Sequence, residues 1–313
     1  MHDRTITLGD INVRVTSDSD VGVEALQRMI GALRATPGAP RCTIRVGPGA
    51  PELPEREPDA TFPERRIWNN GDVVFIQDAS GVVARAGPSE AWLGFDRLGR
   101  DDAIVGIRQT FLPAVGHVMA FHDRFLVHAG AVCPAGRTVL VLGGSGAGKS
   151  TLGLAALQSG WPIVSDDLVV LRRTDDGHVE VAGVPRPPMV PTDLGADLGP
   201  DVSDMPGDPR RRAELPPSIL TTGFHRVEAV VVSGHATGPA TDVEAASGGE
   251  VIYQLLGAFP AAAHPEHVKR AHPLFTAIAR LPRVRLGHGV DPSGRLRGAA
   301  DALDALSRRL AGC

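Results

Sequence analysis

The residues best suited to chemistry in this sequence are a glycine-rich segment and an acidic pair that follows it. The segment "GGSGAGKS", residues 143–150, matches the pattern G-x-x-x-x-G-K-[ST], and Asp166 and Asp167 come next, at the end of "PIVSDD". Backbone N–H groups of such a loop surround a phosphate, its lysine reaches the β and γ oxygens, and its serine hydroxyl ligates Mg²⁺. The sequence therefore predicts a site for ATP and Mg²⁺.

The segments around the loop have the composition that this chemistry requires. "TVLVL" before it is apolar and β-branched, as in a strand, and "STLGLAALQS" after it favours a helix. A helix that begins at the loop turns its positive end toward the phosphates, and glycines allow the close approach of the backbone. The residues expected to bind the nucleotide are Gly143, Gly144, Ser145, Gly146, Ala147, Gly148, Lys149, Ser150 and Thr151.

The second carboxylate of the acidic pair needs a reason of its own. Adjacent residues on a strand point to opposite faces, so Asp166 and Asp167 can both face a nucleotide only where the strand has ended. One carboxylate suffices for the metal. The other either makes a local cap or ion pair, or acts as a general base for an acceptor hydroxyl, as a kinase requires.

A histidine precedes the loop. His128 comes 15 residues before Gly143, at the end of "RFLVH", which we interpret as the strand before that of the loop. Pairing of the two strands would bring its imidazole toward the phosphates. A lone histidine after an apolar run also occurs as a satisfied core residue, so spacing alone leaves both roles open.

The segment from residue 127 to 171, "VHAGAVCPAGRTVLVLGGSGAGKSTLGLAALQSGWPIVSDDLVVL", resembles the catalytic core of the bacterial HPr kinase/phosphorylase family of P-loop serine kinases. That core has a histidine, a strand-turn-strand, the glycine-rich loop, a helix and a strand that ends in an acidic pair. The resemblance implies transfer of the γ-phosphate of ATP to a serine-type hydroxyl of a peptide or small protein. It implies Asp166 as the base, His128 as a support for the phosphate or the carboxylate, Lys149 on the phosphates, and Ser150 and Asp167 as metal ligands.

Two features depart from that family. Its Glu-Ile-Arg-Gly-Leu-Gly segment after the acidic pair has no counterpart, so the resemblance does not extend to reverse phosphorolysis. The first part of the chain shows no clear similarity to the family's N-terminal domain. Some relatives of this divergent kind are encoded with ribosomal-peptide biosynthesis genes, and the lasso-peptide kinases among them phosphorylate a precursor peptide. The family forms hexamers, which leaves a homo-oligomer open here.

Two other functions stay open at this point. One is a kinase for a small molecule, which a small closed pocket would favour over a long groove. The other is a nucleotide-binding regulator or assembly ATPase in which Asp166 positions water, although the sequence carries no recognisable arginine-finger or hexameric-motor signature. ATP turnover that is slow alone and rises with an acceptor would favour a kinase.

The expected architecture is α/β, with a P-loop, HPr-kinase-like core in residues 123–313 and a smaller, β-rich α/β domain in residues 1–122. The first part predicts a strand over 5–15, a helix over 21–36, an exposed loop over 48–66, a hairpin over 72–87 and a helix over 104–121.

The second part predicts two strands over 124–144, strands around a hairpin turn over 161–183, and a buried strand over 225–234, followed by helices, a last strand and a final amphipathic helix. The Pro-rich stretch 185–218 is expected to be a long loop that is mobile or partly ordered without ligands and forms part of the acceptor groove.

Composition limits the partners. The chain is 42% hydrophobic and 22% charged with a net charge of −4, so it is globular and has no basic excess for nucleic acid. Cys42, Cys133 and Cys313 form no CxxC pair, which argues against a disulfide framework or a zinc site. With no signal peptide and no apolar run of membrane-spanning length, we expect a soluble cytoplasmic protein with no membrane partner.

Overall fold

The computed structural model describes residues 2–30, 37–184, 189–190, 202–204, 211–213, 221–235, 242–288, 299–304 and 308. Contacts divide the chain into two compact units, one of Met1–Leu126 with Phe259–Ala271 and one of Val127–Ala258 with His272–Cys313. The protein is mixed α/β, with an eight-stranded and a nine-stranded sheet. That residues 1–122 and 123–313 are separate domains stays a prediction.

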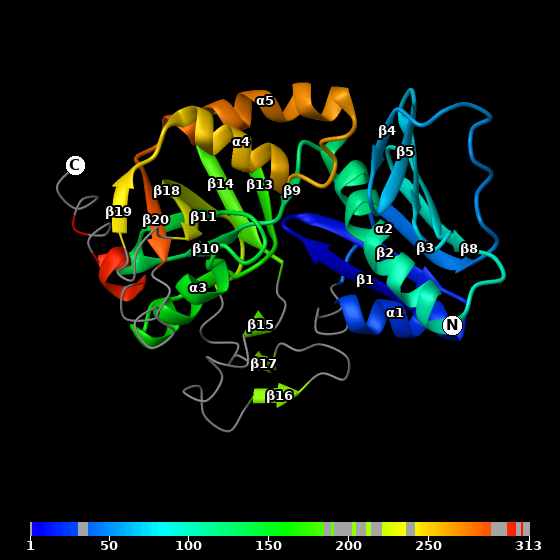
Figure 1. The fold of residues 1–313 in the computed structure, drawn as a ribbon, viewed down its shortest axis with the longest axis horizontal. Coiled ribbons are helices and arrows are strands. Elements are labelled where there is room, and N and C mark those ends of the chain that lie inside the picture. The colour runs from blue at the N-terminus through cyan, green and yellow to red at the C-terminus, as the bar shows by residue number, and fades with distance from the viewer. Residues whose placement is uncertain are drawn as a thin grey trace. The chain divides into compact units, whose positions relative to one another are not determined.

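The first unit contains the eight-stranded sheet and two helices, α1 (Asp20–Ile30) and α2 (Arg100–Ala120). The strand order is β1-β2-β3-β8-β7-β6-β5-β4 (Figure 1). Alternate strand residues are buried, as in β2, so one face of the sheet supplies the core. The strands are β1 (His2–Leu8), β2 (Ile11–Ser17), β3 (Cys42–Pro48), β4 (Ala60–Phe62), β5 (Arg65–Asn70), β6 (Val73–Asp78), β7 (Val83–Ala86) and β8 (Glu90–Phe95).

Two expectations for this unit are wrong in detail. The single strand predicted over 5–15 is the hairpin β1–β2, with Leu8 opposite Ile11 and Gly9 at a φ of 66° in the turn. The segment 48–66, predicted as an exposed loop, includes β4 and the start of β5. The part of this segment around Arg56 is hydrogen-bonded to the sheet. The indole nitrogen of Trp68 donates to the carbonyl of Arg56 at 2.8 Å. The hairpin β6–β7 is confirmed.

The segment Phe259–Ala271, from late in the chain, also belongs to the first unit. Its His264 and His267 are buried together with His117 of α2. His117 Nε2 lies 3.1 Å from the carbonyl oxygen of Asp72, and His264 Nε2 lies 3.0 Å from that of Gly71. A carbonyl only accepts, so both Nε2 atoms carry hydrogen. His117 Nδ1 therefore accepts from His267 Nε2 at 2.8 Å. These contacts fix the tautomer of His117 and make Nε2 of His267 a donor.

The second unit contains the nine-stranded sheet, in the order β12-β10-β11-β18-β14-β13-β9, with β20 paired to β18 and β19 to β20. β11, β18 and β20 run parallel, and their apolar residues pack with α3 in one core cluster. The strands are β9 (Phe125–Val127), β10 (Gly130–Val132), β11 (Thr138–Leu142), β12 (Ile163–Ser165), β13 (Val169–Arg173), β14 (Val179–Gly183), β18 (His225–His235), β19 (Asp242–Ala245) and β20 (Arg283–His288). Its helices are α3 (Lys149–Gln158) and α4 (Gly248–Ala258), besides the short 3₁₀ turn η1 (Pro134–Gly136). Helix α5 (Pro265–Arg280) belongs to the first unit up to Ala271 and to the second unit from His272.

The region predicted as two strands over 124–144 holds three. His128 lies between β9 and β10, and β10 is the strand that pairs antiparallel with β11. The hairpin turn predicted after β13 is confirmed, with Gly177 at a φ of 87°. Within the described residues, no helix has both the length and the apolarity to cross a membrane.

The Pro-rich stretch is not wholly a structureless loop. Its described residues form a small antiparallel sheet of β15 (Met189–Val190), β17 (Arg211–Ala213) and β16 (Val202–Asp204). The rest of 185–218 lies outside the described residues, and with it the predicted mobility and acceptor groove.

Candidate nucleotide site

The glycine-rich segment, residues 143–150, which we call the phosphate loop, connects the fully buried strand β11 to α3. This is the strand-loop-helix order that the sequence predicts. Gly143 has a φ of 153°, and a Cβ there would lie 2.6 Å from the carbonyl oxygen of Ser233. Glycine is required at this position because β18 comes so close.

The centre of the phosphate loop faces solvent. Gly144, Ser145 and Gly146 are exposed, whereas Ala147 is buried. Gly148, at a φ of 91°, is the N-cap of α3, and no side chain among the described residues caps this end. The first N–H groups of α3 are therefore left for a ligand, as an anion site requires.

The Lys149 side chain folds back onto the phosphate loop. Its Nζ donates to the carbonyl oxygens of Gly143 at 2.7 Å and Gly144 at 3.0 Å. Burial lowers the pKa of Lys149, while the charges of Asp167 and Asp166 raise it. The structure thus brings the lysine and the acidic pair into one electrostatic neighbourhood.

The acidic pair, Asp166 and Asp167, comes immediately after the end of β12, as the sequence analysis required. The hydroxyl of Ser165 ends the strand: it donates to the carbonyl of Leu168 at 2.9 Å and accepts from the Leu168 amide at 3.3 Å. The two carboxylates have different surroundings. Asp166 is 5% exposed, and its Cβ lies 3.5 Å from where a Cβ on Gly153 of α3 would be, whereas the Asp167 side chain is 34% exposed.

His128 contacts the second carboxylate of the pair. Its Nδ1 lies 3.1 Å from Oδ1 of Asp167, and its side chain is 46% exposed. Its backbone amide donates to the carbonyl of Ala258 at 2.8 Å, which fixes the residue between β9 and β10. The alternative of a buried core histidine is therefore wrong. Asp167 therefore has a local side-chain partner, as one of the two interpretations of the sequence expected, and that partner is His128.

Ser233 is a site residue that sequence reasoning missed. It follows the apolar part of β18, is 3% exposed, and donates its hydroxyl hydrogen to the carbonyl of Ala147 inside the phosphate loop. The two residues are 86 positions apart. A hydroxyl at the end of an apolar strand was the available signal, but the sequence does not state which strand lies beside the loop.

The residues present fit a nucleotide with Mg²⁺. The loop offers backbone N–H groups at the uncapped start of α3 and a lysine, and Ser150 and Thr151 place two hydroxyls in the first turn of α3. No three His, Cys, Asp or Glu residues of the described chain form a metal site by themselves. Mg²⁺ does not need one, because it is held by one or two carboxylates together with phosphate oxygens and water.

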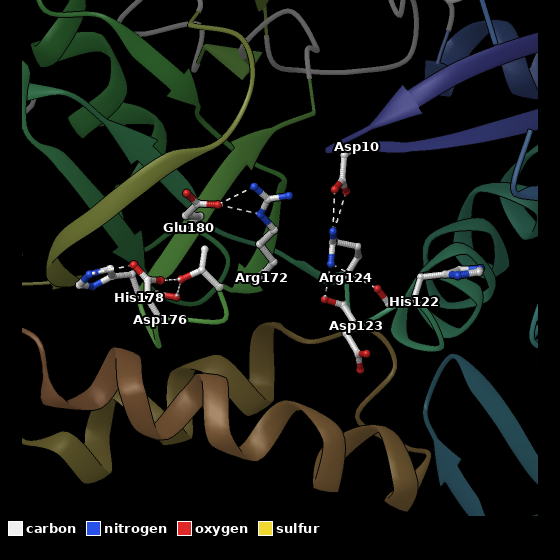
Figure 2. Close-up of polar contacts among 9 residues, drawn as sticks. Asp10, His122, Asp123, Arg124, Arg172, Asp176, His178 and Glu180 are labelled. Carbon is white, nitrogen blue, oxygen red and sulfur yellow. Dashed lines mark hydrogen bonds and ion pairs between the residues drawn. The ribbon is translucent and has the colours of Figure 1, made fainter. Parts of the chain in front are cut away.

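Other polar contacts support the framework. Arg172 donates to Glu180 at 2.7 Å across β13 and β14 (Figure 2). The Arg172 guanidinium also lies 3.8 Å from the ring centre of Phe224. In the first unit, Nε and Nη2 of Arg124 each donate to a carboxylate oxygen of Asp10 at 2.6 Å. These pairs tie strands and turns together.

No protein-family model matches the sequence, and no curated protein matches it. Among solved structures, the chain is similar to the Hpr(Ser) kinase/phosphatase from Coxiella burnetii. The identity is 13% and the TM-score 0.33, over 60% of this chain and 93% of that one. This is a distant structural likeness.

Proposed function

We propose that this protein is an ATP-dependent kinase that transfers the γ-phosphate to a serine-type hydroxyl of a peptide or small protein in the cytoplasm. The observation that carries the proposal is the exposed pair of His128 and Asp167, 3.1 Å apart, in the electrostatic neighbourhood of Lys149. A second carboxylate, Asp166, is also present. Phosphoryl transfer needs one carboxylate for the metal and a second group that faces the acceptor.

The geometry favours an assignment of the two carboxylates opposite to the one that the family resemblance implies. Asp166 is buried against α3, the helix that also carries Ser150, so these two residues would hold Mg²⁺. Asp167 is open to solvent and oriented by His128, so it would accept the proton of the acceptor hydroxyl. Mg²⁺, when bound, supplies positive charge to the β- and γ-phosphate oxygens.

The remaining groups would hold the phosphates while the bond changes. The hydroxyl oxygen forms a bond to the γ-phosphorus as the bond to the β–γ bridging oxygen breaks, and ADP leaves. Lys149 would release the carbonyls of Gly143 and Gly144 to contact the β and γ oxygens. The N–H groups of the phosphate loop would contact the same anion.

The test of transfer uses peptides encoded near the gene, incubated with the protein, ATP and Mg²⁺. We expect a mass increase of about 80 Da, one phosphate, on a serine. Phosphorylated metabolites in place of peptides would identify a small-molecule kinase. Rapid ATP hydrolysis with no phosphorylated product from any neighbouring peptide or metabolite would contradict transfer and favour the ATPase.

The test of binding uses Lys149→Ala. Loss of the charge should abolish transfer and greatly reduce the thermal stabilisation of the protein by Mg-ATP. Lys269→Ala is a matched control, because Lys269 is the only other lysine in the sequence and pairs with Glu266 on the surface of α5. Equal stabilisation of the parent and Lys149→Ala would refute the assignment of the loop.

A further inference from the structure

The backbone of the phosphate loop has little rigidity of its own. Four of its eight residues are glycines, Gly143, Gly144, Gly146 and Gly148. Glycine rotates between positive and negative φ at small cost, so a peptide plane between such residues can turn over. A loop that must aim N–H groups at a phosphate therefore needs an external contact that fixes its peptides.

Strand β18 supplies that contact. It runs parallel to β11 with Leu142 opposite Val232, which places Ser233 beside the first residue of the loop. The Ser233 side chain is buried, and its hydroxyl donates to the carbonyl oxygen of Ala147. The backbone of Ser233 is also close, since its carbonyl oxygen leaves no room for a Cβ on Gly143.

The direction of this hydrogen bond sets the direction of the next N–H. In a trans peptide the C=O and N–H bonds point in opposite directions. The Ala147 carbonyl points toward β18, so the amide of Gly148 points away from β18. We propose that Ser233 is a positioning residue for the nucleotide: it holds the Ala147–Gly148 peptide so that the Gly148 N–H faces the β-phosphate. The inference rests on the proposed nucleotide function.

The test is the affinity of the folded protein for ADP and ATP in Ser233→Ala, measured by calorimetry with Mg²⁺. We expect a loss of about tenfold for both nucleotides, the size of one hydrogen bond to a charged group. Ser233→Thr keeps the hydroxyl and should retain most of the affinity. Thr138→Val is the matched control, because it removes a buried hydroxyl from the opposite end of β11, where Thr138 contacts Cys133.

The outcomes separate this inference from the proposed function. A parent protein that binds no nucleotide overturns both. A parent that binds, with Ser233→Ala binding equally well, overturns only the role of Ser233. A purely structural role would lower the melting temperature of the free protein and leave the affinity of the folded fraction unchanged. If Ser233→Ala does not fold, Ser233→Cys replaces it, because a thiol is a weaker donor of similar size. Its nucleotide affinity should be lower than that of the parent and of Ser233→Thr, without being lost completely. Parental affinity in Ser233→Cys would overturn the role of Ser233.

Discussion

Asp166 and Asp167 are neighbours in the chain with different surroundings. The first is buried against α3, and the second is a third exposed beside His128. The motif and the need for a strand end could be predicted from the sequence, because both are local patterns. Which carboxylate faces outward could not, because it depends on how the Ser165 hydroxyl turns the chain after β12.

Replacing each of the two carboxylates should impair a different step, phosphoryl transfer for Asp167 and Mg²⁺ binding for Asp166. Asp167→Asn should bind Mg-ATP and lose transfer by roughly 10²–10⁴-fold, because an amide cannot accept the proton. Asp166→Asn should need more Mg²⁺ for the same ATP-induced stabilisation. Single-turnover transfer and Mg²⁺ titration measure the two effects. The reverse pattern would restore the roles that the family resemblance implies.

At the scale of elements, the site depends on strand contacts between distant parts of the sequence. Period-two alternation predicts strands well, yet its phase shifts at the Gly9 turn, where Leu8 and Ile11 are three residues apart, and the prediction of a single strand overlooked that break. Likewise, the sequence predicts a strand at β18 but not that it lies beside β11. Ser233 was missed for this reason, because strand order is decided by long-range packing.

Strand β14 should control the position of β12. A Cβ on Gly183 would lie 1.9 Å from the carbonyl oxygen of Val164, the residue before Ser165. Gly183→Ala should therefore destabilise the protein by roughly 1–3 kcal/mol and displace the acidic pair. Mg-ATP should then raise the melting temperature less than in the parent, as measured by thermal unfolding with and without nucleotide.

Gly257→Ala in α4 is the control for that experiment. Apart from the neighbouring backbone of α4 itself, no described atom lies within 4 Å of a Cβ added there, and alanine favours a helix by up to about 1 kcal/mol. This variant should be as stable as the parent or more so. Parental stability and parental nucleotide response in Gly183→Ala would show that β12 tolerates the displacement.

At the scale of the whole molecule, the buried histidines make stability depend on pH. Burial lowers the pKa of His117 to about 4 and that of His267 to about 3 from the usual 6.5. Below pH 6.5 the unfolded chain binds protons that the folded chain does not. The free energy of unfolding is therefore fully retained above pH 6.5 and decreases as the pH falls toward 4, by roughly 3 kcal/mol per histidine.

Denaturant unfolding between pH 4 and pH 7 checks this expectation. His267→Gln should flatten the decrease between pH 6.5 and pH 4, because it removes one depressed pKa. His178→Gln is the comparison variant, since that side chain is 42% exposed and lies outside the buried histidine cluster. If the free energy of unfolding of His267→Gln depended on pH as steeply as that of the parent, other groups would account for the loss of stability at low pH.

The segment 259–271 that brings His264 and His267 to His117 has a consequence for synthesis on the ribosome. The N-terminal portion of the first unit ends at residue 126, but the core of this unit closes only after residue 271, which is synthesised 145 residues later. At elongation rates of about 5–20 residues per second this is a delay of roughly 7–30 s. During that interval part of the apolar surface of the nascent sheet is exposed. A chaperone that binds apolar surface would bind the nascent chain best in this interval.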